Sequence, residues 1–203
     1  NSNVWGPMHW GHAESKDMVH WKNLPIALFP DSIGCIFSGG AVVDNNNTSN
    51  LSKSGIPPIV ATFTHHDFKG EKAKTNDFQK QSIAYSLDGG AEWIKYKGNP
   101  VIPNTEKIKD FRDPKVFKQG DMYYVTVGTK MDGYAQLLLY RSTDLINFEY
   151  VGPMLYNNIQ LQGVYECPDF VEIDGQQVLI VSPQNLPQDG YQYENIHSVV
   201  YML

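Results

Sequence analysis

Apolar and polar residues alternate in short runs along this chain, and a two-residue period is typical of half-buried β-strands. The runs are rich in Val, Ile, Tyr and Phe, which favour strands. No stretch has the apolar spacing of an amphipathic helix. The pattern therefore predicts an all-β fold, with strands over residues 59–64, 82–86, 122–127, 136–142, 169–173 and 177–182.

Turn signals separate these runs. Gln119-Gly120-Asp121 precedes one predicted strand, and Asp174-Gly175 between two runs is a strong signal for a tight hairpin. Residues 45–58 are mostly polar, so we expect a surface loop there.

Two segments 54 residues apart resemble each other. One begins with Arg112-Asp113 followed by Pro, and the other with Glu166-Cys167 followed by Pro. Each continues as an alternating strand, a glycine turn and a second strand, and a repeat of this length indicates blades or arrays. Because equivalent positions in a propeller face one central axis, we expect Arg112, Asp113 and Glu166 to converge on one pocket.

A shorter motif, Ser-x-Asp followed by an aromatic residue, occurs at Ser15-Lys16-Asp17 before Trp21, Ser86-Leu87-Asp88 before Trp93, and Ser142-Thr143-Asp144 before Phe148. Each Asp can accept backbone N–H bonds in a turn, with the aromatic ring packed beneath, so we predict that Trp21 is a core residue. Together the two repeats predict blades that open near residues 37, 112 and 166. We expect residues 1–203 to hold the end of one blade, two whole blades and much of a fourth.

Composition excludes several classes of protein. The 203 residues suffice for one sizeable core, 19% of them are charged, and the net charge is −6. Such a chain, without a run of Lys or Arg, is a poor candidate for binding nucleic acid or an anionic membrane, and no apolar run could span a bilayer. Cys35 and Cys167 make no disulfide framework, and no Cys/His spacing suggests zinc. The chain begins at Asn1 without a signal-like segment, so we interpret it as a piece of a longer protein and leave its compartment open.

Three acidic or basic residues could carry chemistry. Glu166, beside apolar strands, suits a general acid, or it could cap a turn or pair with a Lys. Arg112 and Asp113 could form a structural ion pair, or Asp113 could accept hydrogen bonds from sugar hydroxyls while Arg112 orients it. The residues alone leave these alternatives open.

Other candidates carry weaker signals. Trp5 could stack on a sugar ring or belong to the core. We expect His65-His66-Asp67 to lie in a loop rather than bind a metal, since no partner ligands are evident elsewhere. We expect Cys167 to be a packed, inert thiol, since no base is evident beside it.

Six motifs, in this order, resemble those of glycoside hydrolase family 32, the β-fructosidases (invertases, levanases, exo-inulinases and sucrose-6-phosphate hydrolases). They are Trp5-Gly6-Pro7-Met8-His9-Trp10-Gly11-His12, Ser15-Lys16-Asp17-Met18-Val19-His20-Trp21, Leu24-Pro25-Ile26-Ala27-Leu28, Ile36-Phe37-Ser38-Gly39, Phe111-Arg112-Asp113-Pro114-Lys115-Val116 and Tyr165-Glu166-Cys167-Pro168. Arg-Asp-Pro alone is a weak signal, but the set extends over nearly the whole chain.

The resemblance implies a five-bladed β-propeller, incomplete in these residues, and usually a following β-sandwich, which is absent here. It implies retaining hydrolysis of β-fructofuranosides such as sucrose, levan or inulin, without a metal or organic cofactor. The family nucleophile is an Asp in a Trp-Met-Asn-Asp-Pro-Asn-Gly type motif that does not occur here. We expect this Asp upstream of residue 1, and we expect residues 1–203 alone to be inactive.

The resemblance also assigns roles to individual residues. It implies that Glu166 is the general acid/base. It implies that Asp113 holds fructosyl hydroxyls and stabilises the transition state. Trp5, Phe37, Ser38 and Arg112 match positions that bind the fructosyl group.

Alternative functions are a sialidase, an arabinan- or xylan-cleaving propeller and a non-catalytic sugar-binding propeller. The turn over residues 86–93 matches that of sialidases, but those enzymes use three arginines and this chain has only Arg112 and Arg141. A missing Asp in the upstream sequence would favour the binding protein. The residues do not decide between sucrose, levan and inulin, or between hydrolysis and fructosyl transfer.

Overall fold

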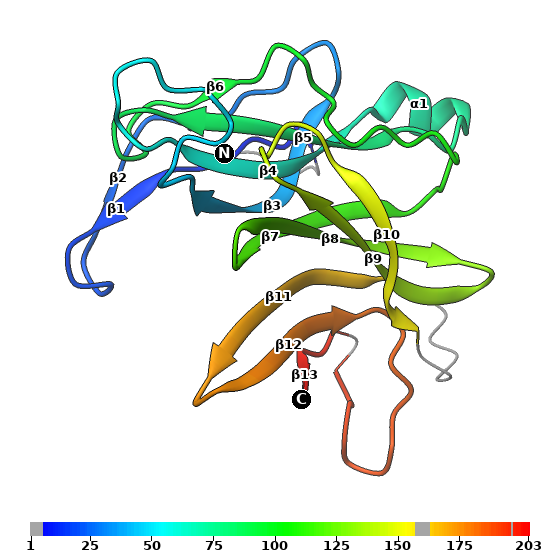
Figure 1. Ribbon diagram of the computed structural model, residues 1–203. Coiled ribbons are helices and arrows are strands. Elements are labelled where there is room, and N and C mark those ends of the chain that lie inside the picture. Colours follow the sequence, from blue (N-terminus) through cyan, green and yellow to red (C-terminus); the bar gives the residue numbers. More distant parts are fainter. Residues whose placement is uncertain (1–5, 157–162, 196) are drawn as a thin grey trace.

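Over residues 6–156, 163–195 and 197–203, which the computed structural model describes, the chain forms antiparallel β-sheets and one short helix (Figure 1). The helix is α1 (Phe68–Ala73). The strands are β1 (Ala13–Ser15), β2 (Trp21–Asn23), β3 (Cys35–Val43), β4 (Ile59–His66), β5 (Gln79–Ser86), β6 (Ile94–Lys95), β7 (Phe111–Gln119), β8 (Met122–Met131), β9 (Tyr134–Ser142), β10 (Glu149–Tyr156), β11 (Tyr165–Ile173), β12 (Gln176–Pro183) and β13 (Val200–Met202).

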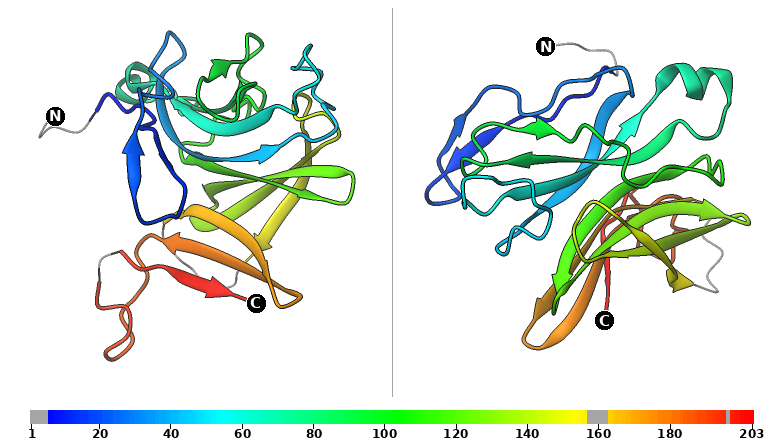
Figure 2. Two further views of the ribbon diagram at one scale, coloured as in Figure 1. Left: turned by 90° about the vertical axis from the view of Figure 1, so that its left-hand side faces the viewer. Right: turned by 45° about the horizontal axis from the view of Figure 1, so that its top comes forward.

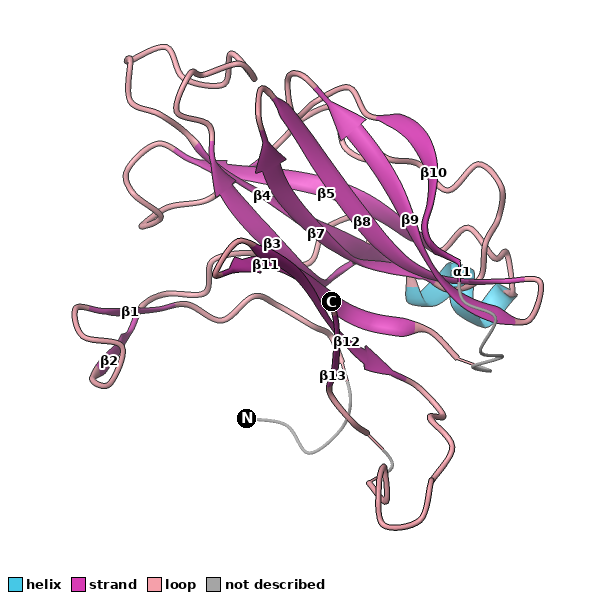
Figure 3. Cartoon of the chain, turned by 60° about the horizontal axis from the view of Figure 1, so that its bottom comes forward, coloured by secondary structure: helices cyan, strands magenta, loops and turns pink. Residues whose placement is uncertain are grey.

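Each sheet is a simple meander, in which strands consecutive along the chain pair with each other. The orders are β1-β2, β3-β4-β5-β6, β10-β9-β8-β7 and β11-β12-β13. The three larger sheets follow one another through the molecule in chain order (Figure 2). Their first strands lie side by side, because β3 packs against β7 and β7 packs against β11 (Figure 3).

The all-β prediction is confirmed, and each of the six predicted strand ranges lies within an observed strand. Residues 45–58 form the predicted loop, and the turn at Asp174-Gly175 has the left-handed φ values of a tight hairpin, 51° and 78°. The prediction missed α1, whose six residues are too few to show a helical period. It also missed β10, where two register shifts against β9 break the two-residue period.

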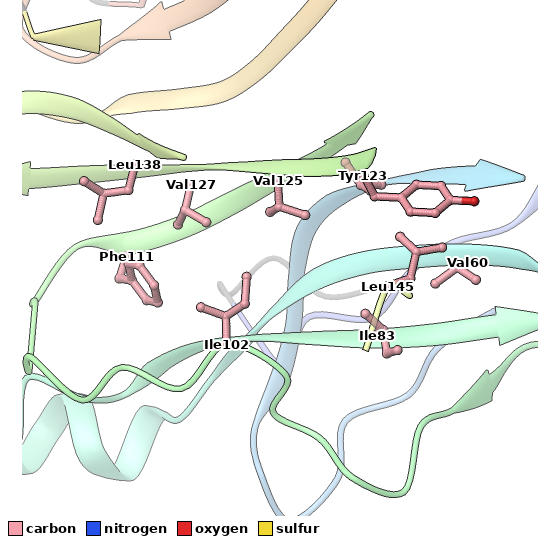
Figure 4. Close-up of a cluster of buried hydrophobic side chains, with 10 residues drawn as sticks. Val60, Ile83, Ile102, Phe111, Tyr123, Val125, Val127, Leu138 and Leu145 are labelled. Atoms are coloured by element: carbon pink, nitrogen blue, oxygen red, sulfur yellow. The ribbon is translucent and has the colours of Figure 1, made fainter. Parts of the chain in front are cut away.

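The largest buried cluster lies between the β3–β6 sheet and the β7–β10 sheet (Figure 4). Burying one Val, Leu, Ile or Phe side chain contributes ~1.5–3 kcal/mol, so this cluster fixes the two sheets face to face. A second cluster joins β9 to β11 and β12. The first cluster consists of Val60, Ile83, Ile102, Phe111, Val116, Tyr123, Val125, Val127, Leu138 and Leu145.

The Ser-x-Asp turns form as predicted, with one error about the aromatic residues. Asp17, Asp88 and Asp144 each accept backbone N–H bonds from residues two to four positions later. Trp93 and Phe148 pack against core clusters, but the prediction that Trp21 is a core residue is wrong, because Trp21 is 59% exposed. It lies in the two-stranded sheet, which is too small to bury an indole.

Candidate active site

The first strands of the three larger sheets each contain one extra residue at the same place. The register shifts after Ile36 in β3, after Arg112 in β7 and after Glu166 in β11. In the last two strands the next residue, Asp113 or Cys167, has a left-handed φ of 60° or 47°. Such backbone strain in a non-glycine residue is concentrated at functional sites, and the bulge re-aims the side chains around it.

Residues at equivalent positions of β7 and β11 contact each other between the sheets. The repeat predicted that Arg112, Asp113 and Glu166 converge on one pocket. The structure brings the three residues together, but of the three only Asp113 lines the hollow described below. The pairs are Arg112 Nη2 and Glu166 Oε1 at 3.0 Å, Cys167 N and Asp113 Oδ2 at 3.0 Å, and Lys115 Nζ and Asp169 Oδ1 at 2.7 Å.

Glu166 has a side chain that is 30% exposed. Arg112 Nη2 and Gln184 Nε2 both donate to its Oε1, at 3.0 and 2.8 Å. Arg112 Nη1 donates to Asp110 Oδ1 at 2.7 Å, so the guanidinium is held between two carboxylates. The charged partner of Glu166 is therefore Arg112 rather than a Lys, and its carboxyl stays accessible.

Asp113 is almost completely buried, at 7% exposure. Burial raises the pKa of its carboxyl above the ordinary value, although the Cys167 N–H bond and the charge of Arg112 favour the ionised form. The Asp113 N–H donates to Thr64 Oγ1 at 3.1 Å, and that hydroxyl donates to Gln81 Oε1 at 2.7 Å. These buried hydrogen bonds fix the backbone that carries the carboxylate.

A hollow of about 190 Å³ lies where β3, β7 and β11 meet. Ser38 and Asp113 both line it, and the Arg112–Glu166 pair lies one position earlier on the strands. The Phe37 ring stacks on His66, with 4.2 Å between centroids and 6° between planes. Trp5 lies outside the described residues. The lining residues are Ser38, Gly39, Asp113, Pro114, Lys115, Cys167, Pro168 and Asp169.

The expected position of His65 and His66 needs correction. His65 and His66 are not in a loop but end β4, where both are buried, and only Asp67 follows the strand, as the N-cap of α1. Among the described residues, no three His, Cys, Asp or Glu side chains gather as a metal site would require.

Cys167 is exposed rather than packed. The pKa of its thiol lies above the ordinary value, because surrounding protein excludes part of the water and the carboxylate of Asp113 lies nearby. A raised pKa disfavours the reactive thiolate, although the Asp113 carboxylate lies beside the thiol, with 3.7 Å between Cys167 Sγ and Asp113 Oδ2. No helix among the described residues is long and apolar enough to cross a membrane.

Sequence reasoning missed three features of the site. The Lys115–Asp169 pair was detectable, because the same 54-residue offset places opposite charges at equivalent positions. Asp110 lies two residues before Arg112, so its pairing with Arg112 could also have been predicted from the sequence. Gln184 had no local signal, since only the fold brings it to Glu166.

Comparison with known proteins defines the class. All of residues 1–203 match the family described as "Glycosyl hydrolases family 32 N-terminal domain". The chain therefore belongs to glycosyl hydrolase family 32.

Individual relatives include a levanase and a sucrose-6-phosphate hydrolase. The chain is 49% identical to a levanase of Bacillus subtilis over 170 residues, which cover 83% of this chain and 23% of the levanase. It is 36% identical to a sucrose-6-phosphate hydrolase of Zymomonas mobilis over 217 residues, which cover 98% and 39%. The chain spans about two fifths or less of the length of these relatives.

Solved structures agree with these matches. A Bombyx mori GH32 beta-fructofuranosidase superposes with a TM-score of 0.80 at 35% identity, covering 98% of this chain and 40% of that chain. A mutant of that enzyme is in complex with sucrose. A fructofuranosidase from Schwanniomyces occidentalis, in complex with fructose, gives a TM-score of 0.80 at 33% identity, covering 99% and 38%.

Proposed function

We propose that the protein containing these residues hydrolyses β-fructofuranosidic bonds, in sucrose or in fructans such as levan and inulin, with retention of configuration. The observation that carries the proposal is an accessible carboxyl, Glu166, held by Arg112 beside the buried carboxyl of Asp113 in a family 32 chain. The related structures with sucrose and fructose support a fructoside substrate.

We also propose that the sheets are blades of a five-bladed propeller. Supporting this, β3, β7 and β11 carry the same bulge and pack in succession, as the innermost strands around one axis do. In this architecture the hollow with Ser38 and Asp113 faces the axis and receives the fructosyl group. Phe37, Arg112 and Trp5 are the other residues that we propose bind it.

The proposed reaction has two steps. The Asp expected upstream of residue 1 attacks the anomeric carbon while Glu166 gives its proton to the leaving oxygen, which forms a fructosyl-enzyme. Glu166, now a carboxylate, then takes a proton from the water that displaces the enzyme carboxylate and releases fructose. Asp113 accepts hydrogen bonds from the sugar hydroxyls, and these bonds strengthen as positive charge develops on the ring.

The test is Glu166→Gln in the complete protein. The amide keeps the shape of the side chain but neither donates an acidic proton nor acts as a base, so turnover on sucrose should fall by roughly 10²–10⁴-fold or more. With an activated fructoside the first step needs little protonation, so a fructosyl-enzyme should accumulate, and azide should speed its release. Wild-type turnover by a normally folded variant would remove Glu166 from the mechanism.

A further inference from the structure

Among the described residues, two hydrogen-bond donors reach Glu166, and both act on the same oxygen. Arg112 and Gln184 both donate to Oε1, and no donor among the described residues reaches Oε2. We propose that Gln184 is a positioning residue for Glu166 and that the proton exchanged with substrate and water is carried on Oε2. This inference rests on the proposed acid/base function of Glu166.

Chemistry favours Oε2 as the site of the proton. A protonated carboxyl has one O–H group. An oxygen whose two lone pairs already accept N–H bonds cannot also carry the proton unless one of these hydrogen bonds is lost. Arg112 and Gln184 therefore reserve Oε1 as an acceptor in both protonation states. They also fix the plane of the carboxyl group, so that Oε2 keeps one direction through both steps of the reaction.

The position of Gln184 is itself fixed by the chain around it. Its N–H donates to the Val164 carbonyl at 3.0 Å, and its backbone bridges to His197. Gly163 packs so closely that a Cβ there would lie 2.5 Å from the Gln184 Cβ. The residues just before β11 therefore fix the position of Gln184, and β11 is the strand that carries Glu166.

The effect of the Gln184 amide on Glu166 can be measured separately from the effects of the charged groups around Glu166. Arg112 is the cation that contacts it, and Asp110 pairs with the other side of that guanidinium. Asp113 lies on the bulge of β7, and the Cys167 thiol lies on the bulge of β11 itself. The side chain of Gln184 carries no charge. Replacing it by an apolar side chain removes a hydrogen bond to the carboxylate and leaves every formal charge in place.

Gln184→Met in the complete protein tests the proposal, because Met keeps the length of the side chain and lacks the amide. The alkaline limb of the kcat/KM profile on sucrose reports loss of the acid's proton. Hydrogen bonds to the ionised carboxylate favour that form, so their loss should move the limb to higher pH, by roughly half a unit to one unit. The acidic limb should stay in place, and kcat should fall by about 10-fold, since the carboxyl is less well oriented.

Gln177→Met is the matched control. Gln177 Nε2 of β12 donates to Glu172 Oε2 of β11 at 2.9 Å, so the same kind of pair lies at the exposed far end of this hairpin, whereas Gln184 directly follows β12. This variant should leave both limbs and kcat unchanged. A structural role for Gln184 would lower the amount of active enzyme without moving the alkaline limb.

The outcomes separate this proposal from the one on which it rests. An unmoved alkaline limb in a folded Gln184→Met variant overturns the positioning role, while a large loss of turnover in Glu166→Gln would still support the acid/base assignment. Wild-type turnover in Glu166→Gln overturns both. If Gln184→Met does not fold, the alkaline limb is measured in the smaller variant Gln184→Leu, and thermal melts verify that this variant folds.

Discussion

Asp113 combines a left-handed backbone with a buried carboxyl. Asn and Asp tolerate this φ better than other side chains, because their short polar groups bond locally to the backbone. Asn is therefore the replacement that removes the charge while keeping the bulge. The repeat predicted where Asp113 lies, but the burial and the bond from Cys167 depend on how β7 meets β11 and could not be predicted from the sequence.

Asp113→Asn in the complete protein should lower kcat and kcat/KM together, by roughly 10²–10³-fold. The reason is that the proposed bonds from sugar hydroxyls to a carboxylate strengthen only as the transition state forms. Steady-state kinetics on sucrose measure the change. A variant with nearly wild-type kcat would show that Asp113 has a structural role only.

Thermal melts of the same variant provide a control, because the direction of the change in melting temperature follows from the pKa of Asp113. Burial raises the pKa of Asp113 in the folded protein, so folding opposes its ionised form. Above the unfolded pKa of the carboxyl, Asp113→Asn should melt at a higher temperature than the wild type. Below that pH both side chains are neutral, and the advantage should disappear.

At the scale of elements, loop 45–58 is anchored by one buried acid. Asp44 follows β3, is fully buried, and accepts bonds from the N–H and hydroxyl groups of Thr48 and Ser49. Tyr123 of β8 adds a fifth bond at 2.9 Å. The loop was predicted from its polarity, but this anchor was not, since Tyr123 lies 79 residues away in the sequence.

Asp44→Ala should destabilise the complete protein by about 3 kcal/mol or more at pH 7, because five donors lose their acceptor. Tyr123→Phe should cost only about 1 kcal/mol. In the double variant Tyr123→Phe should add little, since its partner is already gone. Urea unfolding measures the free energy of unfolding of all three variants. Full additivity of the two single changes would contradict the inference that Asp44 and Tyr123 stabilise the loop through one shared hydrogen bond.

The pH dependence of this anchor has a definite sign. Burial raises the pKa of Asp44, but the hydrogen bonds from Ser49 and Thr48 outweigh it and hold the pKa below the ordinary value. The stability that Asp44 contributes is thus present above the unfolded pKa of the carboxyl. It should be lost as the pH falls through the lower, folded pKa.

At the scale of the whole molecule, local patterns predicted the all-β fold, the hairpins and the meeting of β7 with β11. Periodicity and turn residues act over a few positions, and the 54-residue repeat carried the one long-range inference. The exposure of Trp21 and the burial of His65 were mispredicted, because each depends on which other strands cover the residue. The contact between Gln184 and Glu166 could not be predicted for the same reason.

His65 shows how burial of one side chain sets the stability of several elements together. It is 1% exposed at the end of β4, its Nδ1 lies 2.7 Å from Ser82 Oγ of β5, and its Nε2 lies 3.3 Å from Asp31 Oδ2. Asp31 also pairs with Lys95 of β6. Burial lowers the pKa of His65 to about 4, against the opposing effect of Asp31.

Because the folded pKa is depressed, the unfolded chain binds a proton at His65 more readily, so stability should be full above about pH 6.5 and fall towards pH 4. The loss from this residue should reach up to about 3 kcal/mol. His65→Gln stays neutral and can still bond Ser82, so the complete protein carrying it should lose less stability over this range. The exposed His9→Gln serves as the control and should follow the wild type. Urea unfolding at several pH values measures the difference, and parallel curves for wild type and His65→Gln would mean that burial of this imidazole does not set the acid limit.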